Sequence, residues 1–209
     1  IIRDHGEPAF VAGRPFRFFS DGELAGVRRG ETVTKGFPDY LASGAEWRWW
    51  GVSSFLVRLD LLRAAGGFAG EPVNGEDADL ALRLGTAPGF VQVLSPTTFA
   101  YRQHAGNIMA SLEKTVSGSR LLIAAERANS YPGGSRRALE RWRIATRHIR
   151  PVSLECVKQR RFAEAWGLYC ASFGWHLRLL RVKYLLAFPL VFLFRSIFPD
   201  ASGRAKSLP

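Results

Sequence analysis

The sequence predicts an α/β fold for residues 1–115 and an α-helical region for residues 116–209. In the first part, apolar runs of strand length alternate with short helical segments, which is typical of a sheet flanked by helices. In the second part, apolar residues recur at helical spacing. Charge divides the chain in the same way: residues 1–119 hold 12 Lys and Arg against 13 Asp and Glu, whereas residues 120–209 hold 17 against 5. We therefore expect two regions with different surfaces.

Extended segments are predicted at residues 9–19, 52–58, 90–94 and 97–103. Gly13 and Pro15 interrupt the first of these segments, because neither residue supports a continuous strand. Ser95-Pro96 separates the last two, since a proline after a short polar residue favours a turn. The first part of the chain should therefore contain a small sheet.

Helices are predicted between these segments and throughout the second part. Two short helices are predicted at residues 58–65 and 76–85. The first ends at Gly66 and the second at Gly85, because glycine suits a helix end. A further short helix is expected between residues 38 and 45. The longer helices are expected from Ser111 to a break at Tyr131-Pro132-Gly133-Gly134, and then at residues 135–148, 151–158 and 161–182.

An uncharged apolar run occupies residues 184–194, between Lys183 and Arg195. A helix that crosses a bilayer needs about 20 apolar residues, and Pro189 lies in the middle of this shorter run. The run therefore indicates a segment that lies in the membrane interface or, equally well, a helix buried against the rest of the protein. The basic residues around it favour an anionic partner, which is a membrane face, a phosphorylated ligand or a nucleic acid.

Two adjacent acids, Glu76 and Asp77, begin one of the predicted helices. Acidic residues in a first helical turn complement the helix dipole, and Asn74 or Gly75 is a suitable cap. The spacing alone therefore favours a structural role. The same carboxylates also suit catalysis, because a positioned carboxylate takes the proton from a hydroxyl nucleophile.

The order of a Gly-Gly-Phe turn at residues 66–68, the Glu76-Asp77 pair and a leucine-rich helix resembles the acceptor-side half of a family-2 glycosyltransferase. The resemblance covers roughly residues 5–115. It implies an inverting enzyme of the GT-A fold, of which this chain carries a partial domain. The second acid of the pair is the general base in that family, which implies this role for Asp77, with Glu76 beside it in the catalytic site.

A second stretch, His104-Ala105-Gly106-Asn107 followed by Ser111, is similar to a sequence that often follows the last strand of the family's catalytic domain. The resemblance implies that His104, Asn107 and Ser111 contact the diphosphate of the donor, and that His104 approaches a metal ion. A neutral imidazole suits a divalent metal, and a charged one suits a phosphate. Without the resemblance, a lone histidine is more often a structural residue.

Trp47-Arg48-Trp49-Trp50 leads into residues 52–58, the strand that carries acceptor contacts in the family. Aromatic faces suit the apolar surfaces of sugars. The resemblance therefore implies that Trp49, Trp50 and Arg58 bind the acceptor. Core packing or a membrane-contacting patch is the alternative for the tryptophans.

The nucleotide-binding half of the family, with the Asp-x-Asp motif that holds a divalent Mg or Mn ion, is not found in these 209 residues. Asp77-Ala78-Asp79 has the same letters, but it stands in the position of the general base. We therefore expect that the donor half and most metal ligands precede Ile1 in a longer protein. We also expect an incomplete parallel sheet with an open edge and an uncovered face.

The resemblance implies transfer of a sugar from a nucleotide-sugar donor to a hydroxyl of a saccharide or lipid-linked acceptor in polysaccharide synthesis for the cell envelope. The basic tail and the apolar run predict a peripheral position at the inner, cytoplasmic face of the cell membrane. The alternative is a truncated, non-catalytic module that binds carbohydrate or membrane. Nucleic-acid binding is a distant third: several arginines between residues 136 and 150 share a helix face, but no recognition fold is evident.

Overall fold

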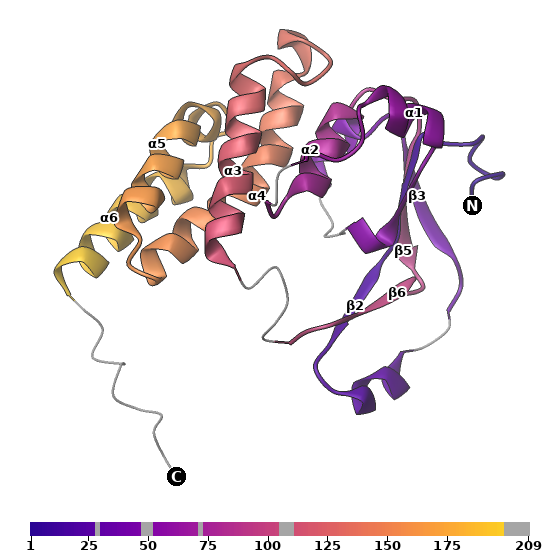
Figure 1. Cartoon of the computed structure of the whole chain (residues 1–209), viewed down its shortest axis with the longest axis horizontal. Coiled ribbons are helices and arrows are strands. Elements are labelled where there is room, and N and C mark those ends of the chain that lie inside the picture. The colour runs from indigo at the N-terminus through magenta and orange to yellow at the C-terminus, as the bar shows by residue number, and fades with distance from the viewer. Residues whose placement is uncertain (28–29, 47–51, 71–72, 105–110, 199–209) are drawn as a thin grey trace.

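A computed structural model of the chain describes all residues except 28–29, 47–51, 71–72, 105–110 and 199–209. Figure 1 shows two parts side by side, one with the strands and short helices and one with four long helices. The strands are β1 (Phe10–Ala12), β2 (Pro15–Phe18), β3 (Val33–Phe37), β4 (Phe55–Val57), β5 (Phe90–Ser95) and β6 (Phe99–Arg102). The helices are α1 (Leu59–Ala64), α2 (Glu76–Arg83), α3 (Leu112–Arg127), α4 (Ala138–Lys158), α5 (Phe162–Arg178) and α6 (Val182–Ile197), with 3-10 turns η1 (Asp21–Gly26), η2 (Leu41–Ala45), η3 (Val52–Ser54) and η5 (Ser135–Arg137). This mixed content confirms the predicted α/β class.

The main sheet has four strands in the order β3-β5-β1-β4. The β1 strand pairs in parallel with β5 and antiparallel with β4, and β3 pairs antiparallel with β5. The expectation of a parallel sheet is therefore wrong for the described strands, because both edge strands run against their neighbours. The β2 and β6 strands form a separate parallel pair.

Side chains alternate between the two faces of the main sheet. Phe10 and Phe90 belong to the main core, with ring centroids 4.9 Å apart. The other face carries a small separate cluster of Val11, Val91 and Val93. Leu56, which pairs with Val11 on the edge strand β4, is 63% exposed. This part of the sheet is therefore only partly covered among the described residues.

The strand predicted at residues 52–58 is shorter in the structure. Only β4 is extended, and the preceding residues form η3. The strand has a ladder partner only as far as Ala12, which pairs with Phe55. Beyond it, the Gly13 amide donates to the Ser54 carbonyl oxygen, 2.5 Å away, and the chain turns toward Pro15. Strand length is thus set by the break in β1.

The two helices predicted at residues 135–148 and 151–158 form one helix, α4, which continues through Pro151. Proline removes a backbone hydrogen bond and normally interrupts a helix. Ile149 and Val152, on either side of it, are buried in the main core. Their packing offsets the lost hydrogen bond, because tertiary contacts supply most of the stability of a protein helix.

The helix predicted at residues 161–182 is also corrected, since α5 ends at Arg178 and α6 begins at Val182. Leu180 has a φ of 54°, a left-handed conformation that breaks the helical path. The apolar run 184–194 therefore lies inside α6. No helix in the described part of the chain is long and apolar enough to cross a lipid bilayer.

One face of α6 is buried against the rest of the protein, as one of the two interpretations predicted, and the position of the other face in a membrane interface stays a prediction. Tyr184 and Phe188 are buried, and Phe188 stacks on Tyr169 of α5 with ring centroids 4.4 Å apart. The exposed face is also apolar and includes Val182, Leu186, Leu190, Leu193 and Ile197. A helix with apolar residues on all sides calls for a second partner on its outer face.

Two arginines of the predicted basic helix face form hydrogen bonds with carboxylates of the protein itself. Arg141 is 2% exposed, and its Nε donates to Glu126 at 2.7 Å. Arg137 donates two hydrogen bonds of 2.8 Å to the carboxylate of Asp39. These arginines join α4 to α3 and to η2, so they are not available to a nucleic acid.

His176 of α5 is fully buried, and neither ring nitrogen has a hydrogen-bond partner among the described residues. Its ring centroid lies 4.3 Å from that of Tyr184. Burial lowers the pKa of His176 to about 3, and the charges of Arg181 and Arg150 add to this effect. The imidazole is therefore neutral in the folded protein at ordinary pH.

Acid should destabilise the protein through this histidine. Because the folded pKa lies below the unfolded value of about 6.5, protonation favours the unfolded chain. The stability that neutral His176 provides is present above about pH 6.5 and is lost as the pH falls toward about 3. Between about pH 7 and about pH 5 we expect this residue to lower the free energy of unfolding by about 2 kcal/mol, measured by urea denaturation.

Two variants distinguish the contribution of His176 from the loss of stability that other titrating groups cause in acid. His176→Leu should reduce the fall but not abolish it, because burial also lowers the pKa of His148 to about 4. His5→Leu, at an exposed histidine, should leave the fall unchanged. Equal slopes in the wild type and both variants would contradict the role of His176.

Candidate functional site

The candidate site begins at the turn before α2. Gly75 is the cap residue of α2 and adopts a left-handed conformation with a φ of 103°. Of the two residues suggested as the cap, Gly75 is therefore confirmed and Asn74 is not. Gly66 and Gly67, also left-handed with φ values of 78° and 68°, end α1 as the sequence predicted. Because glycine adopts a left-handed backbone without strain, Gly75 lets the chain turn directly into α2.

Asn74 fastens the start of α2 to the first turns of α3. Its backbone amide donates to the Lys114 carbonyl oxygen at 3.1 Å. Its side-chain amide donates to Thr115 Oγ1 at 2.8 Å and to the Ser111 carbonyl oxygen at 3.3 Å. Because Asn74 is buried, these bonds hold the start of α2 in one position.

Gly118 allows this close contact. A Cβ atom at this position of α3 would lie 1.7 Å from the carbonyl oxygen of Asn74. The two backbones meet only because the residue has no side chain. The site is therefore built on two helices that are in direct contact.

Asp79, the third acid in the first turn of α2, has a structural role. It is 4% exposed, and it accepts hydrogen bonds from the Tyr131 hydroxyl at 2.8 Å and from Arg83 Nε at 2.9 Å. Burial, with the adjacent charge of Asp79, raises the pKa of Tyr131 well above its usual range, so this hydroxyl stays protonated and donates. Asp79 is thereby held in place and is withdrawn from solvent.

Glu76 and Asp77 are only half-buried, at the first turn of α2. Asp77 Oδ1 accepts a hydrogen bond from the amide of Ala78 at 2.8 Å. Both carboxylates lie on a helix whose start is fixed by Asn74. A carboxylate on such a rigid support can accept a proton from a bound hydroxyl.

Ser111 is near this start, because its carbonyl oxygen accepts a hydrogen bond from Asn74. Its hydroxyl is the cap of α3 and accepts from the Lys114 amide at 3.4 Å. Ser111 therefore has a structural role that the sequence did not indicate. Its predicted diphosphate contact stays a prediction.

The other predicted ligands are not joined to this cluster by any described contact. His104 is exposed, beyond the end of β6. Arg58 precedes α1, and its side chain donates to Asp60 at 2.7 Å and 3.2 Å. Asn107, Trp49 and Trp50 lie outside the described residues.

The predicted divalent metal, with most of its ligands expected outside these residues, stays a prediction. In the described part of the chain, no group of three or more His, Cys, Asp or Glu side chains is arranged to hold one. His104 contributes a single exposed imidazole, whereas a metal site requires several converging ligands.

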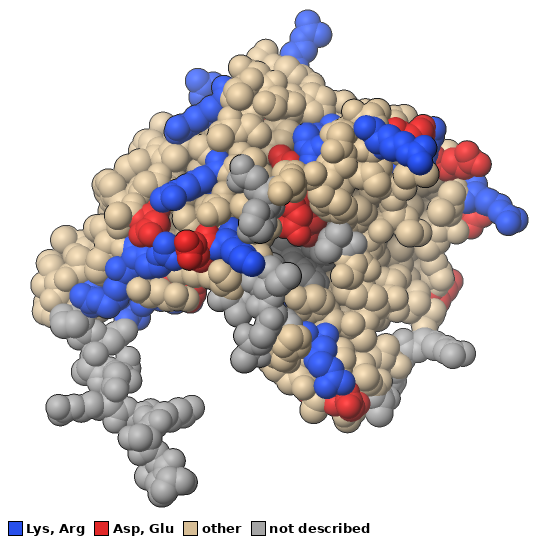
Figure 2. Space-filling model, viewed as in Figure 1, with Lys and Arg blue, Asp and Glu red and all other residues tan. Residues whose placement is uncertain are grey.

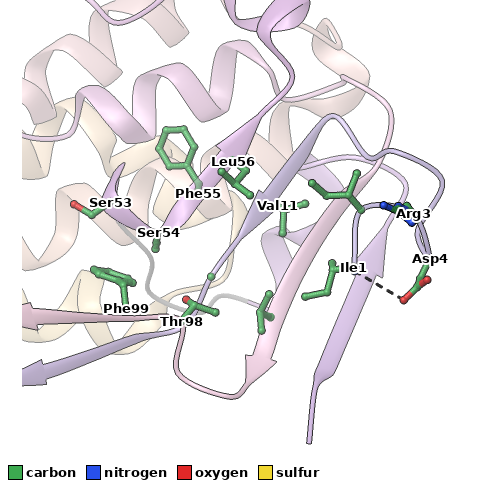
Figure 3. A pocket seen from close by; sticks show the side chains of 13 residues that line it. Ile1, Arg3, Asp4, Val11, Ser53, Ser54, Phe55, Leu56, Thr98 and Phe99 are labelled. Atoms are coloured by element: carbon green, nitrogen blue, oxygen red, sulfur yellow. Dashed lines mark ion pairs between the residues drawn. The ribbon is translucent and has the colours of Figure 1, made fainter. Parts of the chain in front are cut away.

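A cavity of about 610 Å³ lies elsewhere, at the partly covered face of the main sheet. Figure 3 shows Ile1, Arg3 and Asp4 on one side of it and Ser53 and Phe99 on the other. None of the predicted site residues that the structure describes lines this cavity. On the face of the molecule drawn in Figure 2, Lys and Arg side chains are spread over the helical part.

Three residues of the site were not predicted in these roles: Asn74, Asp79 and Tyr131. Asn74 was considered only as a cap, although an asparagine two residues before a helix can also bond to another element. Tyr131 stands in a Pro-Gly-Gly turn but is 3% exposed. A buried phenol requires a partner, and only the folded chain brings it to Asp79.

No protein-family model matches this chain, and neither a curated protein nor a solved structure matches it.

Proposed function

We propose that this chain carries the acceptor side of an inverting glycosyltransferase with Asp77 as its general base. The observation that carries the proposal is the position of Asp77, which is half-buried in the first turn of α2, the helix whose start Asn74 fastens to α3. Asp79, two residues further along, is buried and accepts hydrogen bonds from Tyr131 and Arg83. The sequence resemblance to family-2 glycosyltransferases supports the same assignment.

In the proposed reaction, the Asp77 carboxylate removes the proton from an acceptor hydroxyl. The hydroxyl oxygen then attacks the anomeric carbon of a nucleotide-sugar, and the bond to the diphosphate breaks with its electron pair. A positioned base makes this attack possible, because a neutral hydroxyl is a poor nucleophile. Asn74 acts as a positioning residue, since it holds the turn that carries the base.

We also propose that the protein lies at the inner face of the cell membrane, where saccharide or lipid-linked acceptors are exposed. The outer face of α6 supports this position, and α5 extends it with the exposed Trp166, Phe173 and Leu177. Large exposed apolar patches mark interaction sites. An interfacial helix with basic residues nearby suits an anionic membrane surface.

The test is sugar transfer by the protein as its gene encodes it, so that any donor-binding segment outside these residues is present. Uridine, guanosine and thymidine diphosphate sugars are supplied with a lipid-linked saccharide fraction, with and without Mg or Mn. Release of the nucleoside diphosphate together with a glycosylated product is the expected result. Binding of the acceptor without any turnover would contradict the enzyme and favour the non-catalytic binding module.

A further inference from the structure

Four arginines meet where α4 passes the turn between α5 and α6. Arg143, Arg147 and Arg150 are spaced by four and three residues, so they lie on one face of α4. Arg181, the residue before α6, joins them because its Nη2 donates to the Arg143 carbonyl oxygen at 3.3 Å. Burial lowers the pKa of Arg181 to about 10, and the charges of the other three arginines contribute.

No carboxylate balances these charges in the part of the chain that the structure describes. None of the ion pairs there includes any of the four arginines. Nearby acids in the sequence pair with other cations: Glu46 with Lys35, Glu140 with Arg137 and Glu155 with Lys158. The cluster therefore has an uncompensated positive charge.

Two of the guanidinium groups also carry unused donors. Nη1 of Arg147 and Nη1 of Arg181 are buried and have no hydrogen-bond partner among the described residues. Nη2 of Arg147, by contrast, donates to the Ala45 carbonyl oxygen at 3.2 Å. Charged donors left without a partner destabilise a protein, and the planar guanidinium matches the oxygens of a phosphate. The cluster has the chemistry of a phosphate site.

The surroundings of Arg181 are apolar and open to solvent. Leu180 is 81% exposed and Val182 is 54% exposed, and the exposed apolar face of α6 continues from there. The sequence has no Asp or Glu between Glu164 and Asp200. A membrane supplies both an apolar layer for α6 and anionic phosphates for the arginines, whereas a soluble phosphate compound would leave the apolar face uncovered.

We propose that Arg143, Arg147, Arg150 and Arg181 bind the phosphate group of an anionic membrane lipid while α6 lies in the interface beside it. The inference rests on the membrane attachment proposed above, and it is independent of sugar transfer. The lipid phosphate accepts hydrogen bonds from the exposed guanidinium groups of Arg143 and Arg150, and its negative charge offsets the mutual repulsion of the four arginines. The α5–α6 turn is then the point at which the protein is fixed on the membrane.

The test compares two pairs of substitutions that remove equal charge. Arg143→Gln with Arg150→Gln changes two exposed side chains of the cluster, and Arg63→Gln with Arg136→Gln changes two exposed side chains away from it. The full chain is sedimented with vesicles of phosphatidylcholine alone and of phosphatidylcholine mixed with phosphatidylglycerol. Circular dichroism and thermal unfolding verify that all proteins are folded.

The wild type should prefer the phosphatidylglycerol vesicles. Substitution of both Arg143 and Arg150 should lower the partition coefficient of the protein onto these vesicles by about 25-fold. Each arginine near an anionic leaflet raises that coefficient by about fivefold. The control pair should lower it by about twofold at most, because its residues contact the lipid only through screened charge. On phosphatidylcholine alone, the wild type and both pairs should behave alike.

Other outcomes would overturn the proposal in distinguishable ways. Equal losses in the two pairs would indicate diffuse charge attraction, and no loss in the cluster pair would remove these arginines from the interface. If the wild type bound neither vesicle, the membrane attachment itself would be wrong. If the Arg143 and Arg150 substitutions removed only the thermal stabilisation by free glycerol phosphate, the ligand would be a soluble phosphate compound. If they removed only the binding of a random-sequence RNA, the ligand would be a nucleic acid.

Discussion

Replacing Asp77 with asparagine should lower the rate of sugar transfer by roughly a hundredfold to ten-thousandfold, the range typical for loss of a general base. Asparagine has nearly the same shape, but its amide cannot accept a proton from the acceptor hydroxyl. Its side-chain oxygen can still accept the hydrogen bond from Ala78, so the protein should fold normally. The measurement is kcat/KM for the nucleotide-sugar, together with thermal unfolding of both proteins.

Asp21→Asn is the matched control for this prediction. Asp21 forms a surface ion pair with Arg102, and its side chain is 72% exposed. Surface ion pairs contribute little to stability, so this variant should transfer sugar at the wild-type rate. Near-normal turnover in a folded Asp77→Asn protein would show that Asp77 is not the base, and Glu76→Gln would then test its neighbour.

Gly118→Ala should lower the free energy of unfolding by about 3 kcal/mol or more. The added Cβ atom would lie 1.7 Å from the carbonyl oxygen of Asn74, and this atom belongs to the backbone. It cannot rotate away as a side chain can, so α3 must separate from the start of α2. The bonds of Asn74 to Lys114 and Thr115 should weaken at the same time. Equilibrium denaturation by urea measures the loss.

Gly167→Ala provides the opposite result at another helical glycine. Gly167 lies in α5, and a Cβ atom there would meet nothing within 4 Å. Alanine favours a helix over glycine, so this variant should gain about 0.5 to 1 kcal/mol. Two alanine variants with the same stability would contradict the close contact between α3 and Asn74.

The Gly118→Ala and Asp77→Asn variants together distinguish effects on stability from effects on sugar transfer. Because Gly118 holds the turn that carries Asp77, its substitution should reduce both stability and transfer. The Asp77 variant should reduce transfer alone. A Gly118→Ala protein that was destabilised but transferred sugar normally at low temperature would show that the position of the turn does not control the base.

The sequence predicted the elements whose ends have a local chemical cause. Gly66 ends α1 and Gly13 with Pro15 separates β1 from β2, because these residues restrict the backbone wherever they occur. The periodic apolar residues of α3 predicted a helix from Ser111 for a similarly local reason. Such signals act over a few residues, so a single sequence contains them fully.

The wrong predictions concern segments in which packing prevails over local preference. Pro151 lies inside a continuous helix because Ile149 and Val152 are buried on either side of it. The break at Leu180 has no glycine or proline to announce it; it occurs where α6 folds back and brings Tyr184 against Ser153 of α4, with their hydroxyl oxygens 2.7 Å apart. These contacts join residues far apart in the chain.

The α/β class, the positions of most elements and the Glu76-Asp77 pair at a helix start follow from local signals that a single sequence contains. The buried position of Asp79 depends on the fold, because the Tyr131 hydroxyl that donates to it lies 52 residues further along the chain. The tertiary structure also decided the strand order, since pairing depends on contacts between distant segments. The arginine cluster has the same origin: Arg181 meets Arg143 only because α5 and α6 fold back along α4.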